Sequence, residues 1–115
     1  DSGKPNYDPD NVAAAAEALR QADLRPALMV DCSHANSGKQ HEQQEVVWRN
    51  LIQQRVDSKG QTPVIGAMIE SNLGEGRQDI PEDRSAMQYG VSVTDACLGW
   101  PKTEELLLEG HKALA

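Results

Sequence analysis

Large aromatic side chains are scarce in this sequence, which has no phenylalanine and only two tryptophans and two tyrosines among its 115 residues. A chain of this length forms one ordinary domain and buries roughly two thirds of its unfolded surface. Apolar residues make up 38% of the chain and charged residues 25%, which is typical of a globular domain. We therefore expect a modest core built mainly from aliphatic side chains.

Other shortages exclude whole classes of protein. No stretch approaches the roughly 20 apolar residues that span a bilayer, and the N-terminus lacks a signal-peptide pattern. The two cysteines, Cys32 and Cys97, form neither a disulfide framework nor a C-x-x-C pair, so a reducing cytoplasm is the expected location. The formal net charge of -7 argues against non-specific binding to nucleic acid or to anionic membranes.

What the sequence does contain is an apolar run, 28–30, that ends abruptly in Asp31-Cys32-Ser33-His34. A polar, helix-like segment follows at once. This pattern is typical of a buried parallel strand that delivers functional side chains at its carboxyl end. Two later stretches repeat it, with an apolar strand at 62–69 ending at Glu70 and a short strand at 91–94 ending at Asp95.

The remaining chain supplies helices and connections around these strands. We expect helices over 12–22, capped by Asp10 or Asn11, over 40–56, and from about residue 103, with strands at 27–31, 62–69 and 91–94 and a long loop over 71–88. This alternation predicts an α/β fold of right-handed βαβ units with a parallel sheet. Three strands are too few for a closed eight-stranded βα barrel, which needs about 250 residues.

The three expected strands end in His34, Glu70 and Asp95. Neighbouring strands lie about 4.8 Å apart, so one imidazole and two carboxylates can converge on one divalent ion. Nitrogen and oxygen donors suit Mn, Fe, Co or Zn better than Ca. Each residue also has a simpler interpretation, because a histidine after a strand often only bonds its loop and a carboxylate there often caps the next helix. Composition and spacing leave both interpretations open.

The cysteines offer an alternative ligand set. Cys32 lies two residues before His34 and Cys97 two after Asp95, so a Cys-His-Glu-Asp set within the chain is one alternative. The preferred interpretation is that both cysteines are small buried residues that pack beneath the site.

Weaker candidates are expected to be solvated. The segment 41–45 lacks the second histidine of the H-E-x-x-H pattern and is interpreted as an exposed helix face, and His111 is expected to be exposed near the C-terminus. Three cations could lend positive charge to an anionic substrate, although lone surface cations are usually only solvated: Lys39, Arg77 and Lys102.

At these residues the sequence resembles a known family. Four motifs resemble, in order, the C-terminal part of the type I 3-deoxy-D-arabino-heptulosonate 7-phosphate (DAHP) synthases: Pro5-Asn6-Tyr7-Asp8, residues 31–40 (DCSHANSGKQ), residues 66–78 (GAMIESNLGEGRQ) and residues 89–100 (YGVSVTDACLGW). The resemblance covers nearly the whole chain, 1–115, as part of one barrel domain.

The resemblance implies a (β/α)8 barrel enzyme that condenses phosphoenolpyruvate with erythrose 4-phosphate, the first step of the shikimate pathway to aromatic amino acids. In this family a Cys, a His, a Glu and an Asp bind a divalent metal, and His34, Glu70 and Asp95 match three of them. The metal would act on the erythrose 4-phosphate aldehyde, positioning it for attack by phosphoenolpyruvate C3. His34 and Asp95 would be catalytic, with Asp95 also binding the aldose. The three strands would be the sixth, seventh and eighth of the barrel.

The chain also departs from the family pattern. The family's cysteine ligand lies far upstream, and the arginine of its Arg-Gly-Gly motif would fall at or before residue 1. We therefore expect a C-terminal fragment that is inactive by itself. One alternative is a metal-binding module that self-associates through open strand edges, giving a homo-oligomer. Another is a stand-alone metal hydrolase, which fits the three ligands but not the four motifs.

Overall fold

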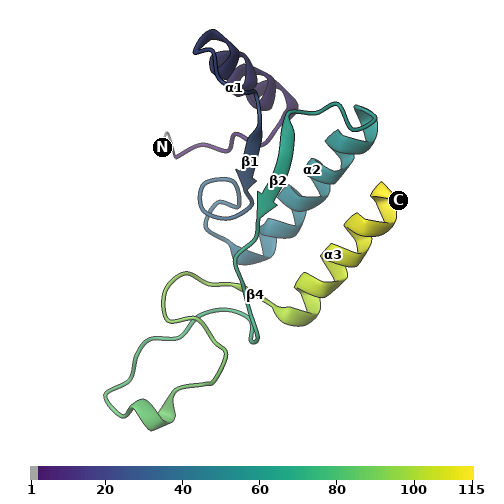
Figure 1. Ribbon diagram of the computed structural model, residues 1–115. Coiled ribbons are helices and arrows are strands. Elements are labelled where there is room, and N and C mark those ends of the chain that lie inside the picture. The colour runs from purple at the N-terminus through teal and green to yellow at the C-terminus, as the bar shows by residue number, and fades with distance from the viewer. Residues whose placement is uncertain (1–2) are drawn as a thin grey trace.

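The computed structural model describes residues 3–115, which form helices and short strands joined by loops (Figure 1). In chain order they are α1 (Pro9–Gln21), β1 (Leu28–Asp31), α2 (Gln44–Asp57), β2 (Val64–Met68), β3 (Ser71–Asn72), β4 (Leu98–Gly99) and α3 (Trp100–Leu114). Two single-turn 3-10 helices, η1 (His41–Gln43) and η2 (Arg84–Ala86), lie before α2 and within the long loop between β3 and β4. The expected α/β fold with parallel strands is confirmed.

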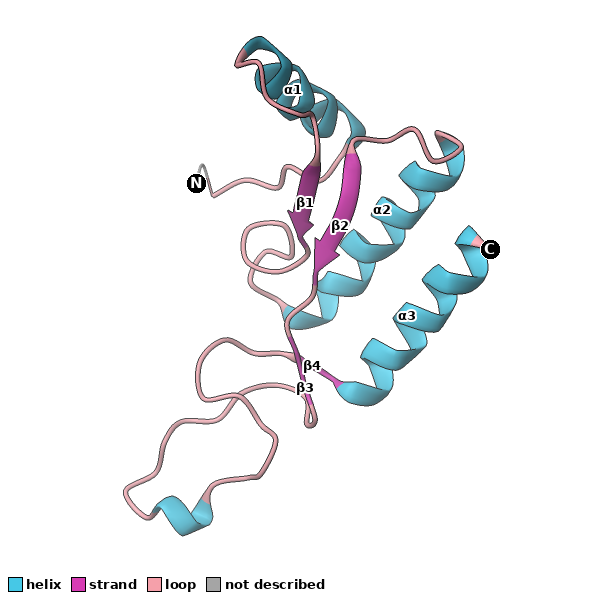
Figure 2. Ribbon diagram, viewed as in Figure 1, coloured by secondary structure: helices cyan, strands magenta, loops and turns pink. Residues whose placement is uncertain are grey.

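The strands form two parallel pairs rather than one sheet (Figure 2). β1 pairs with β2, so that Val30 lies opposite Ala67, and β3 pairs with β4. The expected strand at 91–94 is wrong, because Ser92 forms only an isolated bridge with Arg77, the next two residues are bends, and β4 begins at Leu98. The backbone of residues 91–94 forms hydrogen bonds with the loop that follows β3 and not with a strand. For example, the Gln78 amide donates to the Ser92 carbonyl at 2.7 Å.

All three helices begin at residues other than those predicted from the sequence. Asp8 caps α1, its carboxylate accepting from the Asn11 amide at 3.1 Å, so the helix begins before the expected Asp10 or Asn11 cap. α3 begins at Trp100 rather than near residue 103, because the following proline fits the first turn of a helix. α2 begins only at Gln44, after the 3-10 turn.

The core is small and aliphatic, as the lack of phenylalanine predicted. The two helices α1 and α2 meet β1 and β2 in one cluster of buried side chains: Val12, Val30, Cys32, Val47, Leu51 and Val64. Burying aliphatic side chains contributes about 1.5–3 kcal/mol each, which is enough to fix the strand pair against the helices. The strand ends that carry the site are therefore attached to a packed framework.

α3 packs on α2 through one close contact and a set of ion pairs. The Trp48 indole N–H donates to the Leu106 carbonyl at 2.9 Å. A Cβ on Gly110 would lie 2.7 Å from Trp48 Cζ2, so only glycine allows the two helices to approach this closely. Arg49 on α2 also pairs with Glu109 on α3 at 3.0 Å.

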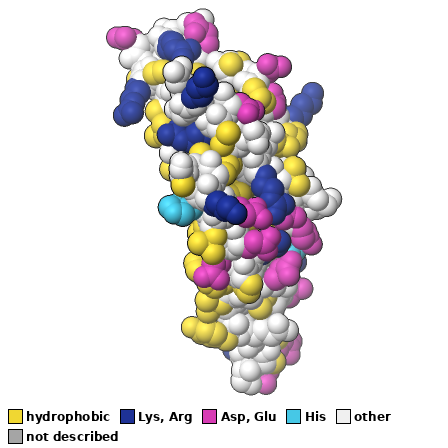
Figure 3. Space-filling model, turned by 90° about the vertical axis from the view of Figure 1, so that its right-hand side faces the viewer, with side chains coloured by type: hydrophobic (Ala, Val, Ile, Leu, Met, Phe, Trp, Pro, Cys, Tyr) yellow, Lys and Arg dark blue, Asp and Glu magenta, His cyan; other side chains and the backbone are white. Residues whose placement is uncertain are grey.

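Figure 3 shows acidic and basic side chains together on the face turned toward the viewer, with apolar side chains spread along its length.

The molecule is elongated because the loop over residues 73–97 extends away from the body (Figure 1). Its radius of gyration is 16.4 Å, against about 13 Å for a compact domain of this length. Several large apolar side chains are exposed, including Met29 at 70% and Ile65 at 63%. Within residues 3–115, no helix is both long and apolar enough to cross a membrane.

Candidate metal centre

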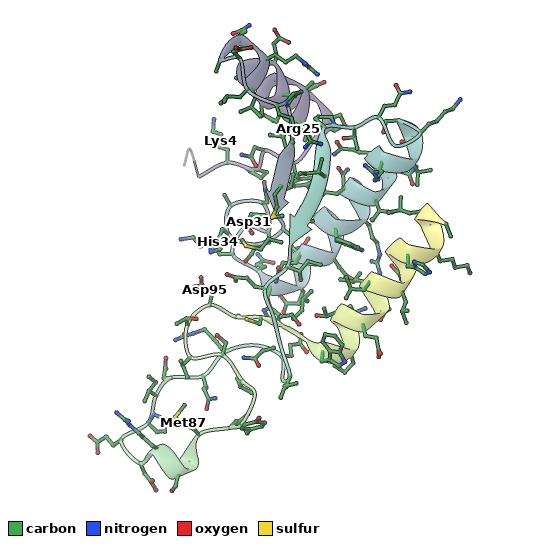
Figure 4. All side chains as sticks on the ribbon, in the orientation of Figure 1. Lys4, Arg25, Asp31, His34, Met87 and Asp95 are labelled. Atoms are coloured by element: carbon green, nitrogen blue, oxygen red, sulfur yellow. The ribbon has the colours of Figure 1, made fainter. Side chains whose placement is uncertain are left out.

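Three side chains from separate parts of the chain meet at one point. His34 Nε2 lies 3.5 Å from Glu70 Oε1 and 3.4 Å from Asp95 Oδ2. One ligand atom from each residue lies within 4.8 Å of the other two. Figure 4 shows His34 between Asp31 and Asp95, next to the end of β1. The structure thus brings together the three residues that the sequence singled out.

Asp95 reaches this point by a route that the sequence did not predict. His34 follows β1 and Glu70 follows β2, as expected, but Asp95 comes before β4 rather than at the end of a strand. Antiparallel backbone bonds between Gly76 and Cys97, at 2.9 and 3.1 Å, hold the loop just beyond Asp95 against the chain that leaves β3. Pairing within the loop therefore directs Asp95 back to the ends of β1 and β2.

The His34 backbone adopts an unusual conformation, with φ 53°. A left-handed backbone is uncommon for a residue with a side chain and costs of order 1–3 kcal/mol, so the surrounding contacts must impose it. One of these contacts is the bond from the Lys39 amide to the His34 carbonyl at 2.8 Å. The turn directs the imidazole toward Glu70 and Asp95.

Asp31 fixes the orientation of the imidazole. Its Oδ1 accepts from the Ser33 amide at 2.8 Å, and its Oδ2 lies 2.7 Å from His34 Nδ1. A carboxylate only accepts hydrogen bonds, so Nδ1 carries a proton, and in the neutral ring the Nε2 lone pair faces the other two carboxylates. Asp31 ends β1, where the core holds it, and the imidazole direction follows from that anchorage.

The same contacts raise the pKa of His34 above its ordinary value. The hydrogen bond to Asp31 is the largest cause, followed by the charge of Asp31, with smaller contributions from Glu70 and Asp95. The neighbouring carboxylates therefore favour a positive charge at this point.

Glu70 is held at both its carboxylate and its backbone. The Ser33 hydroxyl donates to Oε2 at 2.9 Å, which leaves Oε1 facing His34. The side-chain amide of Gln44 accepts from the Glu70 N–H at 2.8 Å and donates to the Glu70 carbonyl at 3.1 Å. Sequence reasoning missed Gln44 and Ser33. The signal for Gln44 was its spacing from Val47 and Leu51, which places it on the buried face of α2.

The residues fit a divalent transition metal. Around a tetrahedral ion with ligands at about 2.1 Å, neighbouring donor atoms lie about 3.4 Å apart, close to the two separations measured from His34 Nε2. One imidazole nitrogen and two carboxylate oxygens are donors that Mn, Fe, Co and Zn accept. Asp31 and Ser33 supply the supporting hydrogen bonds that metal ligands usually have.

A cavity of about 610 Å³ opens beside His34 and Asp95. Two of the three candidate cations, Lys39 and Arg77, line it. The Arg77 side chain is already engaged, donating to the Thr94 carbonyl at 3.0 Å and pairing with Asp79 at 2.7 Å. The third, Lys102, lies away from the cavity and pairs with Glu105 at 3.0 Å.

Two expectations about neighbouring residues need correction. His41 was predicted to be solvated, yet its side chain is only 16% exposed and pairs with Glu75 at 3.0 Å, joining the start of α2 to the loop. Cys97 is only partly buried, although the prediction that Cys32 is a buried packing residue is confirmed. Burial raises the pKa of Cys32 to about 12 and also raises that of Cys97.

The expectation for the third histidine is confirmed, because His111 is exposed.

Comparison with protein families gives one match, which covers nearly the whole chain. The DAHP synthetase I family matches residues 2–108. The chain belongs to the DAHP synthetase I family. The resemblance of the four motifs is thus confirmed.

Individual members of the family support this assignment. The chain is 50% identical over 111 residues to the phospho-2-dehydro-3-deoxyheptonate aldolase, Tyr-sensitive, of Salmonella typhimurium, covering 96% of this chain and 31% of that protein. It is also 50% identical over 110 residues to the Tyr-sensitive protein of Escherichia coli K12, covering 96% and 30%. A solved phospho-2-dehydro-3-deoxyheptonate aldolase from Francisella tularensis SCHU S4 superposes with a TM-score of 0.88 at 34% identity, covering 98% of this chain and 32% of the other. The chain spans about a third of the length of these relatives.

Proposed function

We propose that this chain supplies the metal-binding part of a DAHP synthase active site. In this proposal its βα units are the last three of a (β/α)8 barrel, and the complete site condenses phosphoenolpyruvate with erythrose 4-phosphate. The observation that carries the proposal is the convergence of His34, Glu70 and Asp95 in a chain of this family. The cofactor is a divalent ion, Mn, Fe, Co or Zn.

The three ligands have different exposures, which suggests different roles. The Glu70 side chain is 24% exposed and bonded to Ser33, so it serves as a fixed ligand. The Asp95 side chain is 70% exposed and lines the cavity, so it can contact both an ion and a substrate. In the neutral ring, the bond to Asp31 places the proton of His34 on Nδ1 and leaves Nε2 available as a ligand. A metal bound here supplies Lewis acidity, which polarises an aldehyde for attack.

We further propose that the 115-residue chain does not catalyse the reaction by itself. Among residues 3–115, neither cysteine joins the group formed by His34, Glu70 and Asp95. Among the described residues that line the cavity, the lysine and arginine side chains are Lys39 and Arg77, and Arg77 is already bonded to the Thr94 carbonyl. Two phosphorylated substrates require more cationic groups than these.

A chimera tests the function directly. The chain would replace the matching segment of the Escherichia coli relative, and DAHP formation would be measured with Mn²⁺ and both substrates. We expect an active chimera whose activity is abolished by His34→Ala but retained with His111→Ala, a matched change on the exposed end of α3. A folded chimera that forms no DAHP would contradict the proposal, as would full activity of the His34→Ala form.

A second proposal concerns the isolated chain, which we expect to self-associate. Each strand described has only one neighbouring strand, so β1 and β2 both present an unpaired edge. Exposed apolar side chains lie on the same strands, with Met29 on β1 and Ile65 on β2. Sedimentation equilibrium should show an average mass that rises with concentration. A monomer over a wide concentration range would count against it.

A further inference from the structure

We propose that Gln44 is a positioning residue for the metal site and acts by holding the backbone of Glu70. The inference deepens the proposed function and rests on it, because Glu70 must be a ligand for its position to matter. Gln44 belongs to none of the four motifs and does not itself reach the cluster of ligand atoms.

The burial of Gln44 needs an explanation. Its side chain is 0% exposed, among the most buried large side chains of the chain. An amide buried without partners costs about 1–3 kcal/mol, so a glutamine persists in such a place only if both its ends are bonded. Both ends of Gln44 bond to one residue, Glu70, at 2.8 and 3.1 Å.

The backbone at Glu70 needs this partner because it lies between two strand pairs. β2 ends at Met68 and β3 begins at Ser71, so Glu70 lies in neither strand. Among the described residues, the only hydrogen-bond acceptor for the Glu70 N–H is the side-chain oxygen of Gln44. Its carbonyl accepts from the Leu98 amide at 3.0 Å as well as from Gln44. Gln44 therefore takes the place of a strand neighbour at the Glu70 N–H and gives the Glu70 carbonyl a second donor.

Gln44 is itself well anchored. It is the first residue of α2, and the buried residues Val47 and Leu51, on the same face of the helix, fix α2 against the strands. The Glu70 backbone is thus positioned by a helix held in the core, while Ser33 positions the carboxylate. Together these contacts leave the Glu70 Oε1 atom little freedom to move away from His34.

A double-mutant cycle with Mn²⁺ tests the inference on the 115-residue chain. Gln44→Met keeps an unbranched side chain of similar length but removes both hydrogen bonds. We expect it to weaken Mn²⁺ binding about 10- to 100-fold, the usual effect of removing a group that orients a metal ligand. Gln43→Met, on the exposed neighbouring residue, is the matched control and should leave the affinity unchanged. Circular dichroism identifies conditions in which every variant is folded.

The cycle separates positioning from general stability. In a Glu70→Gln background, Gln44→Met should cause no further loss of Mn²⁺ affinity, although it should still lower the free energy of unfolding. A full additional loss in that background would overturn the inference, as would unchanged affinity of the single Gln44→Met variant. If Glu70→Gln itself leaves Mn²⁺ binding intact, or the unsubstituted chain binds none, the metal site and with it the proposed function are wrong.

Discussion

Asp31→Asn should weaken metal binding at this site without removing any ligand. Asp31 accepts two hydrogen bonds, from the Ser33 amide at 2.8 Å and from His34 Nδ1 at 2.7 Å. An asparagine has one oxygen and one NH₂ group, so either orientation leaves one of these contacts as two facing donors. The orientation that keeps the Ser33 bond forces the His34 proton onto Nε2, the atom that must bind the metal.

The size of the effect follows from this conflict. Leaving one polar contact unmatched costs about 1–3 kcal/mol, and each 1.4 kcal/mol is about a factor of ten in affinity. We therefore expect Mn²⁺ to bind about 10- to 100-fold more weakly, which agrees with the usual effect of removing a carboxylate behind a histidine ligand.

Calorimetry at several pH values above the ordinary histidine range is the suitable assay, because proton competition for Nε2 falls as the pH rises. At lower pH the substitution also lowers the His34 pKa, which would partly mask the loss. Nitrogen NMR of the metal-free protein should show the proton moving from Nδ1 to Nε2. Asp10→Asn, at an exposed position in the first turn of α1, is the control. Unchanged affinity together with an unchanged tautomer would refute the role of Asp31.

Three further predictions follow from the structure. Because its pKa is raised in the folded state, protonated His34 stabilises the metal-free chain. This contribution to the free energy of unfolding is complete below about pH 6.5 and is lost as the pH rises through the raised pKa. Urea titrations in which the free energy of unfolding does not fall over this range would contradict the prediction. Gly110→Ala places a Cβ 2.7 Å from Trp48, and this clash costs about 1–3 kcal/mol. Alanine also favours the helix by about 1 kcal/mol, so we expect urea unfolding to show a net loss of stability of about 1 kcal/mol. A gain in stability would show that α2 and α3 are not in close contact. A thiol reagent should modify Cys97 well before the fully buried Cys32 in the folded chain; equal rates would contradict the packing.

The first two βα units were predictable because their signals are local. An apolar run that ends in a polar cluster located β1 and His34, and the same pattern located β2 and Glu70. Amphipathic spacing likewise identified α2, apart from its first turn. Hydrophobic periodicity and capping residues carry this information within a few residues of each element.

The third unit could not be predicted in the same way. The alternating sequence at 91–94 resembles a strand, but its backbone bonds to a loop about 15 residues earlier, as in the Gln78–Ser92 pair. Asp95 lies next to His34, as predicted, although the strand assigned to it was wrong. Gln44 was missed although its spacing from Val47 and Leu51 places it on the buried face of α2. The sequence does not show its hydrogen bonds to Glu70, 26 residues away.

The most direct test of the central claim is a titration of the chain with Mn²⁺. Binding is measured as the decrease in the electron paramagnetic resonance signal of the free ion. The claim predicts one specific site in the unsubstituted chain, retained with His111→Ala and lost with His34→Ala. Equal binding by the His34→Ala and unsubstituted chains would contradict it, because the ion would then be held somewhere other than between His34, Glu70 and Asp95.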